Sequence, residues 1–107
     1  MEQPINFQAG HYSLSLAVFG DEYVVTIMPV PGGPGCEPDC SRELLYKVLK
    51  DLGQAVRVYQ ALKQAIQNRH AGRVGMPGSG FQRALDQLSP QSAFEVVYRM
   101  TLGLPLR

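Results

Sequence analysis

Two cysteines, Cys36 and Cys40, are the side chains of this sequence best suited to metal or redox chemistry. Their spacing is not the Cys-x-x-Cys of thiol oxidoreductases, and a structural zinc site would need two further ligands. The chain offers only His11 and His70 as nitrogen ligands, and each stands alone in the sequence. We therefore expect ordinary thiols and no metal site, with a zinc site and a regulatory disulfide as the two alternatives.

A glycine-rich segment, residues 75–80, has the composition of a loop that holds an anion on its backbone N–H groups. A phosphate-binding P-loop, however, follows a strand and has Lys and then Ser or Thr after its second glycine, whereas here Phe81 and Gln82 follow. The sequence contains no Gly-x-Ser-x-Gly motif and no acidic pair at ligand spacing. It therefore predicts a flexible connector, no catalytic residue, no cofactor and a protein that is not an enzyme.

Basic side chains gather in the second part of the chain. Residues 1–40 contain five acids and no Lys or Arg, a net charge of −5, whereas residues 41–107 contain all ten basic residues and four acids, a net charge of +6. Either the two parts face one another within the fold, or they form two surfaces for different partners. The basic residues assigned to a surface for an anionic partner, such as nucleic acid, are Lys47, Lys50, Arg57, Lys63, Arg69, Arg73 and Arg83. A solvated helix face is the alternative.

The elements that carry these residues are limited by the length of the chain. A sequence of 107 residues, 45% hydrophobic and 18% charged, is typical of one globular domain. No apolar run approaches the roughly 20 residues that span a bilayer, and the first residues lack the basic and apolar regions of a signal peptide. We therefore expect a single domain over residues 1–107, no membrane partner, and a location in the reducing cytoplasm.

Residues 11–29 predict a β-hairpin. Leu14, Leu16 and Val18 alternate with small residues, as in a strand with one buried face. The Gly20-Asp21 pair suits a tight turn, and the β-branched and aromatic residues after it suit a returning strand. Two strands alone are marginal in water, so this hairpin must pack on helices, pair with another strand, or both.

Residues 41–69 predict one long helix. Ser41 is a suitable N-cap, and apolar residues recur at helical spacing over about 25 residues, or roughly 40 Å of helix. Several are seven positions apart, as in a coiled coil. Because such a helix outreaches the hairpin, we expect its surplus apolar stripe to bind a partner or a second copy. The residues of this expected interface are Leu45, Leu52, Tyr59, Leu62 and Ile66.

Pro-rich and Gly-rich segments and two short amphipathic patterns complete the chain, the second of them opening with Ser89 as a helix cap. The predicted segments are connectors over residues 29–40 and 70–80 and helices over residues 81–88 and 90–102. The fold class is therefore predicted as α+β, with an N-terminal β-hairpin packed on one long helix and two shorter C-terminal helices.

These features favour binding over catalysis. We expect a non-enzymatic protein–protein interaction module: an adaptor, regulator or inhibitor that binds a protein partner, itself as a homodimer, or both. The first alternative is a nucleic-acid-associated accessory protein that uses the basic helix face. The second is a metal- or redox-linked regulator acting through Cys36 and Cys40.

Overall fold

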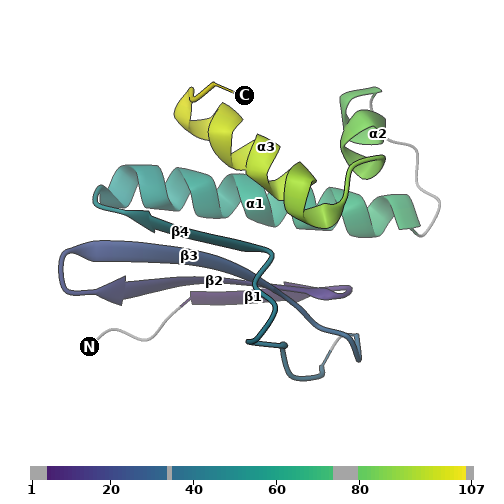
Figure 1. Cartoon of the computed structure of the whole chain (residues 1–107), viewed down its shortest axis with the longest axis horizontal. Helices are drawn as coiled ribbons and strands as arrows, with labels where there is room; N and C mark the ends of the chain where they lie inside the picture. The colour runs from purple at the N-terminus through teal and green to yellow at the C-terminus, as the bar shows by residue number, and fades with distance from the viewer. Residues whose placement is uncertain (1–4, 34, 74–79, 106–107) are drawn as a thin grey trace.

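Four antiparallel strands at the N-terminus form one sheet, and three helices lie on one of its faces (Figure 1). The computed structural model describes residues 5–33, 35–73 and 80–105. The strands are β1 (Ile5–Ala9), β2 (Tyr12–Phe19), β3 (Glu22–Pro29) and β4 (Leu45–Leu49), and they are neighbours in that order. The helices are α1 (Leu52–Arg73), α2 (Gly80–Asp86) and α3 (Pro90–Leu102). The predicted α+β class is confirmed.

The predicted hairpin is present as β2 and β3, which pair in register from Tyr12 opposite Pro29 to Phe19 opposite Glu22. Gly20 has a φ of 64° in the turn, a left-handed conformation that glycine adopts without strain. The sheet also has a strand that was not predicted. This is β1: the chain turns back after it at Gly10, which has a φ of 58°, and β1 pairs with β2.

The predicted helix over residues 41–69 is wrong at its start. Residues 45–49 form β4 instead, because Leu45, Lys47 and Leu49 face the helices in alternation with the exposed side chains between them. Asp51 then caps α1, since its carboxylate oxygen Oδ2 accepts the N–H of Gln54 at 2.8 Å. The helix continues to Arg73, beyond the predicted end.

The two C-terminal helices occur close to their predicted positions. In α3, the hydroxyl of Ser89 accepts the N–H of Ser92, and Pro90 stands at the first helical position. Gly103 ends the helix in the left-handed conformation. The shorter α2 ends at Asp86, and most of the glycine-rich segment before it, residues 74–79, lies outside the described residues.

The core lies between the sheet and α1, which contacts all four strands. Leu14, Val25 and Ile27 of the sheet are fully buried against one face of α1. The buried residues of that helix recur at helical spacing and are Ala55, Val58, Tyr59, Leu62 and Ile66. Phe94 of α3 closes the core at the side, where its ring meets that of Tyr12 edge to face with 5.3 Å between centroids.

The prediction of an apolar interface on the long helix is therefore wrong for most of its residues, because they are buried. Tyr59, Leu62 and Ile66 belong to the core, and Leu45 belongs to β4 and is buried as well. Burial also raises the pKa of the Tyr59 phenol. Of the five predicted interface residues only Leu52, 54% exposed, lies at the surface. Among the described residues, no helix is long and apolar enough to cross a membrane.

Two substitutions on α1 test whether its stripe is core. Ile66→Ala removes a fully buried side chain and should lower the free energy of unfolding by about 2–5 kcal/mol. Val56→Ala, at a position 36% exposed on the same helix, should cost less than about 1 kcal/mol. Urea denaturation followed by circular dichroism measures both. If both variants lost equally little free energy of unfolding, the apolar stripe of α1 would not be buried within a single chain.

Candidate functional site

The edge of the sheet at β4 is the first part of the candidate site. β4 pairs with β3 on one side, and among the described residues no strand pairs with its other side. The N–H of Leu44 donates to the carbonyl of Ile27 at 2.8 Å, so the backbone of Ile27 faces β4. Backbone groups alternate in direction along an antiparallel pair. The backbone N–H and C=O groups of Tyr46 and Val48 must therefore point away from β3, along the free edge.

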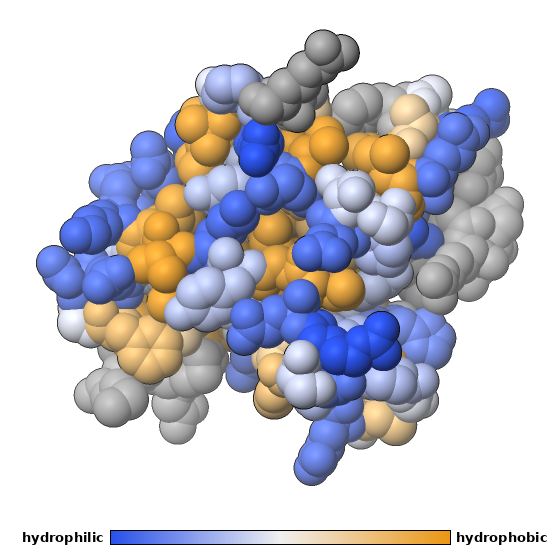
Figure 2. Space-filling model, in the orientation of Figure 1, coloured by the Kyte–Doolittle hydropathy of each residue, from blue (hydrophilic) through white to orange (hydrophobic). Residues whose placement is uncertain are grey.

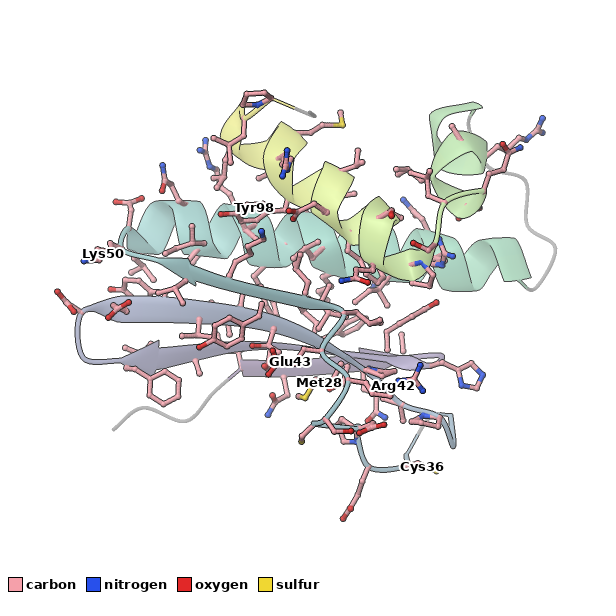
Figure 3. The ribbon with its side chains drawn as sticks, viewed as in Figure 1. Met28, Cys36, Arg42, Glu43, Lys50 and Tyr98 are labelled. Carbon is pink, nitrogen blue, oxygen red and sulfur yellow. The ribbon has the colours of Figure 1, made fainter. Side chains whose placement is uncertain are left out.

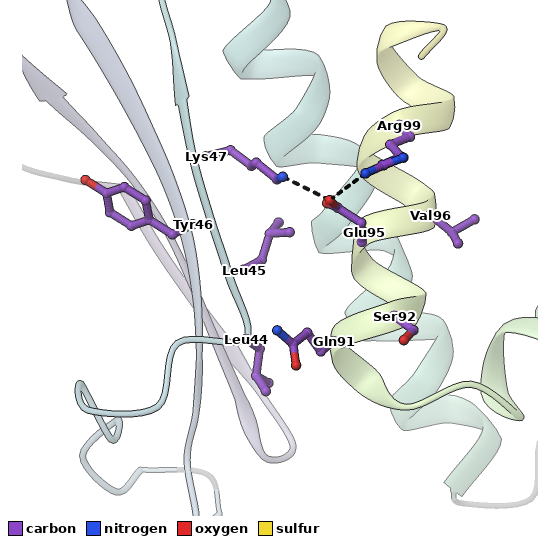
Figure 4. A pocket seen from close by; sticks show the side chains of 9 residues that line it. All are labelled: Leu44, Leu45, Tyr46, Lys47, Gln91, Ser92, Glu95, Val96 and Arg99. Carbon is purple, nitrogen blue, oxygen red and sulfur yellow. Dashed lines mark hydrogen bonds and ion pairs between the residues drawn. The ribbon is translucent and has the colours of Figure 1, made fainter. Parts of the chain in front are cut away.

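A groove of about 700 Å³ lies between this edge and α3 (Figure 4). Leu45 and Lys47 point from β4 toward α3, whereas Tyr46 points to the other side of the sheet. Figure 2 looks onto this side of the molecule and shows apolar surface between hydrophilic side chains. The residues that line the groove are Leu44, Leu45, Tyr46, Lys47, Gln91, Ser92, Glu95, Val96 and Arg99.

Three charged side chains meet across the groove. Lys47 Nζ lies 3.0 Å from Glu95 Oε1, and Arg99 Nη2 lies 3.5 Å from the same oxygen. Lys47 Nζ also lies 4.7 Å from the centre of the Tyr98 ring, a favourable cation–π contact. The other carboxylate oxygen of Glu95, Oε2, is buried and has no hydrogen-bond partner among the described residues. The three side chains together therefore have a net charge of +1. The ammonium of Lys47 and the carboxylate of Glu95 each keep hydrogen-bonding capacity that these contacts do not use.

The sheet face opposite the helices, which we call the open face, borders the same edge. Phe19, Tyr46 and Val48 lie on it and are 60%, 53% and 43% exposed. The connector between β3 and β4, which carries Cys36, lies on the side of the sheet away from the helices (Figure 3). It covers the other end of this face, where the amide of Gln8 donates to the carbonyl of Cys36 at 3.1 Å. A strand added beside β4 would thus contact α3 with one face and the exposed apolar residues with the other.

The seven predicted basic residues do not form one continuous free surface. Lys47 faces the groove from β4, and Lys63 Nζ lies 5.0 Å from the centre of the Phe7 ring. Arg69 donates to the hydroxyl of Tyr12 and to the carbonyls of Leu85 and Leu88. These three cations already make internal contacts that phosphate groups would have to replace. Lys50, Arg57 and Arg83 are exposed, and the side chain of Arg73 lies outside the described part of the chain.

The two cysteines lie in the connector and are both exposed free thiols. Cys36 Sγ is 3.3 Å from the carbonyl of Gly32, and the connector is further ordered by the Ser41 hydroxyl, which donates to the Asp39 carboxylate at 2.6 Å. That hydrogen bond lowers the pKa of Asp39. Within residues 5–33, 35–73 and 80–105, no group of three His, Cys, Asp or Glu residues could hold a metal ion. The side chain of His70 lies outside the described part of the chain.

Sequence reasoning missed the two groove residues on α3, Glu95 and Arg99. Their spacing of four positions is an ordinary helical ion pair and gave no sign of a site. The alternation of Leu45, Lys47 and Leu49 was the available signal for β4, but the same leucines also fitted the helical pattern. Comparisons with protein-family models, curated proteins and solved structures found no match for this chain. The site therefore rests on its own geometry.

Replacing both cysteines tests the metal and redox alternative. Because both thiols are exposed, Cys36→Ser together with Cys40→Ser should change the free energy of unfolding by no more than about 0.5 kcal/mol. Thermal unfolding with and without reductant measures this, and metal analysis of the purified wild type accompanies it. Zinc bound one to one by the wild type and lost from the double variant, with a large fall in stability, would contradict the expectation.

Proposed function

We propose that the protein is a non-enzymatic protein–protein interaction module, an adaptor, regulator or inhibitor, that binds an extended segment of a protein partner along β4. The observation that carries this proposal is the free edge of β4 beside the groove under α3. Addition of a strand to an exposed sheet edge is a common way for small domains to bind peptides. Main-chain hydrogen bonds supply affinity in this mode, and alternate side chains supply specificity.

The edge offers the hydrogen bonds that this mode needs. Tyr46 and Val48 each present one N–H and one C=O outward, so an added antiparallel strand would form four main-chain hydrogen bonds with β4. Proteins usually protect such edges with Pro, with charged side chains, or by covering them with a helix or loop. Among its five residues, β4 has no proline, and its one charged side chain, Lys47, is paired with Glu95, so the edge discourages identical chains but stays open to a segment of other charge.

The two sides of the added strand would meet different surroundings. Side chains on one side would enter the groove and contact Leu45 and Val96, and those on the other would lie beside Tyr46 and Val48 on the open face. Aromatic and β-branched neighbours stabilise cross-strand pairs by about 0.2–1 kcal/mol each. Such a site recognises a short segment rather than a large folded surface. It also leaves the core of α1 intact.

A pair of variants at Val48 tests the proposal. Val48→Pro removes the outward N–H, which β4 does not use for pairing with β3, and proline is tolerated on edge strands at such positions. Val48→Thr keeps the N–H and nearly the same shape. We expect the proline variant to bind the natural partner at least about tenfold more weakly, and the threonine variant to bind nearly as the wild type does.

The measurement begins with the partner isolated as a native complex and then purified. Isothermal titration calorimetry of that partner with each variant gives the affinities, and thermal unfolding confirms that both variants are folded. Equal affinities would place the partner elsewhere on the molecule and contradict binding at β4. Light scattering over a range of concentrations shows whether the partner is a second copy, the homodimer expected from the sequence.

A further inference from the structure

We infer that the segment bound at β4 carries an Asp or Glu opposite Lys47, so that this edge selects acidic extended peptides. The inference rests on the proposed function and adds the chemistry of the partner. It follows from three features of the groove: the register that the free edge imposes, the charge of the Lys47–Glu95–Arg99 group, and the way in which a second copy would have to pair.

The register places one side chain of the segment at Lys47. The outward backbone groups of Tyr46 and Val48 each bond one residue of an added antiparallel strand, and a single residue lies between those two. That residue stands directly opposite Lys47, in a pair of the closer kind, with about 4.5 Å between Cα atoms. Its side chain lies on the same side of the sheet as Lys47 and therefore enters the groove toward α3.

The charge at this point favours an acid. Lys47 and Arg99 share one carboxylate oxygen of Glu95, which leaves the group at a net charge of +1. The ammonium of Lys47 has three donors, and its hydrogen bond to Glu95 uses one of them. A carboxylate opposite Lys47 would accept a charge-assisted bond and bring the group to neutrality.

The same register disfavours a second copy as the occupant. Two β4 strands paired antiparallel with all their outward groups bonded would set Tyr46 of each copy against Val48 of the other. The two Lys47 side chains would then lie directly opposite each other. Like charges in that position destabilise a strand pair. A lysine turned inward on an edge strand is in fact one device that discourages pairing with identical chains. An acidic segment converts this repulsion into attraction.

Three labelled peptides test the inference on the full-length protein. Each is a fluorescein-labelled nine-residue peptide of alternating Thr and Val, with Asp, Asn or Lys at its centre, and binding is followed by fluorescence anisotropy at low and at moderate salt. We expect the Asp peptide to bind about tenfold more tightly than the Lys peptide, with the Asn peptide between them. The preference for Asp should weaken as salt increases.

Matched lysine variants locate the preference. Lys47→Gln should bring the affinities for the Asp and Lys peptides within about twofold of each other. Lys63→Gln is the control, because Lys63 also lies over an aromatic ring, that of Phe7, but on another part of the molecule. It should leave the tenfold ratio unchanged. Thermal unfolding of both variants checks that they are folded.

The outcomes separate this inference from the proposed function. If all three peptides bind equally to the wild type and weakly to Val48→Pro, strand addition stands and the acidic preference is overturned. If no peptide binds while Val48→Pro still loses the natural partner, the acidic preference is again overturned. A dimer in light scattering that Val48→Pro converts to a folded monomer would make a second copy the occupant and overturn the inference. An Asp preference that Lys63→Gln abolishes would do the same.

Discussion

The fold depends on the burial of one helical face against one sheet face. The stripe of α1 that includes Val58, Leu62 and Ile66 lies on the inward residues of β2, β3 and β4, and this contact removes the apolar face of the sheet from water. Phe94 then fixes α3 to the side of this layer by its contact with Tyr12. Because α3 packs mainly on α1 and meets the sheet only at β4, the groove lies between α3 and this edge strand. The groove is therefore a result of how the core is covered.

The acidic first part of the chain, residues 1–40, and the basic second part, residues 41–107, are not joined mainly by ion pairs between them. The ion pairs of Lys47 and Arg99 with Glu95, and of Arg69 with Asp86, all join residues of the basic second part of the chain. Basic residues reach the acidic first part through aromatic side chains instead, with Lys63 over Phe7 and Arg69 at the hydroxyl of Tyr12. Lys63 and Arg69 thus lie at the edge of the core. Their long aliphatic stems can pack on apolar side chains there while the charged groups stay near water.

Much of the fold could be predicted from the sequence, and the candidate site could not. The hairpin and α3 were predictable because their signals are local: alternation beside a Gly-Asp turn, and a Ser-Pro start with a terminal glycine. The start of α1 was not, because Leu45 and Leu49 fit a helical period and a strand period equally well. What decides between them is the unpaired side of β3, a tertiary feature. Glu95 and Arg99 were missed because their significance comes from Lys47, which lies on another element.

The distance along the chain between the two walls of the groove has a consequence for when the site exists. Lys47 and Glu95 are separated by 48 positions, and hairpins with short turns form long before contacts of that range. The groove needs both walls, so it is complete only when the C-terminal helix has docked beside β4. A ligand that binds there binds the native state alone, so each tenfold excess over its dissociation constant would add about 1.4 kcal/mol to the stability of the whole domain. Recognition at this edge would then also report that the chain has finished folding.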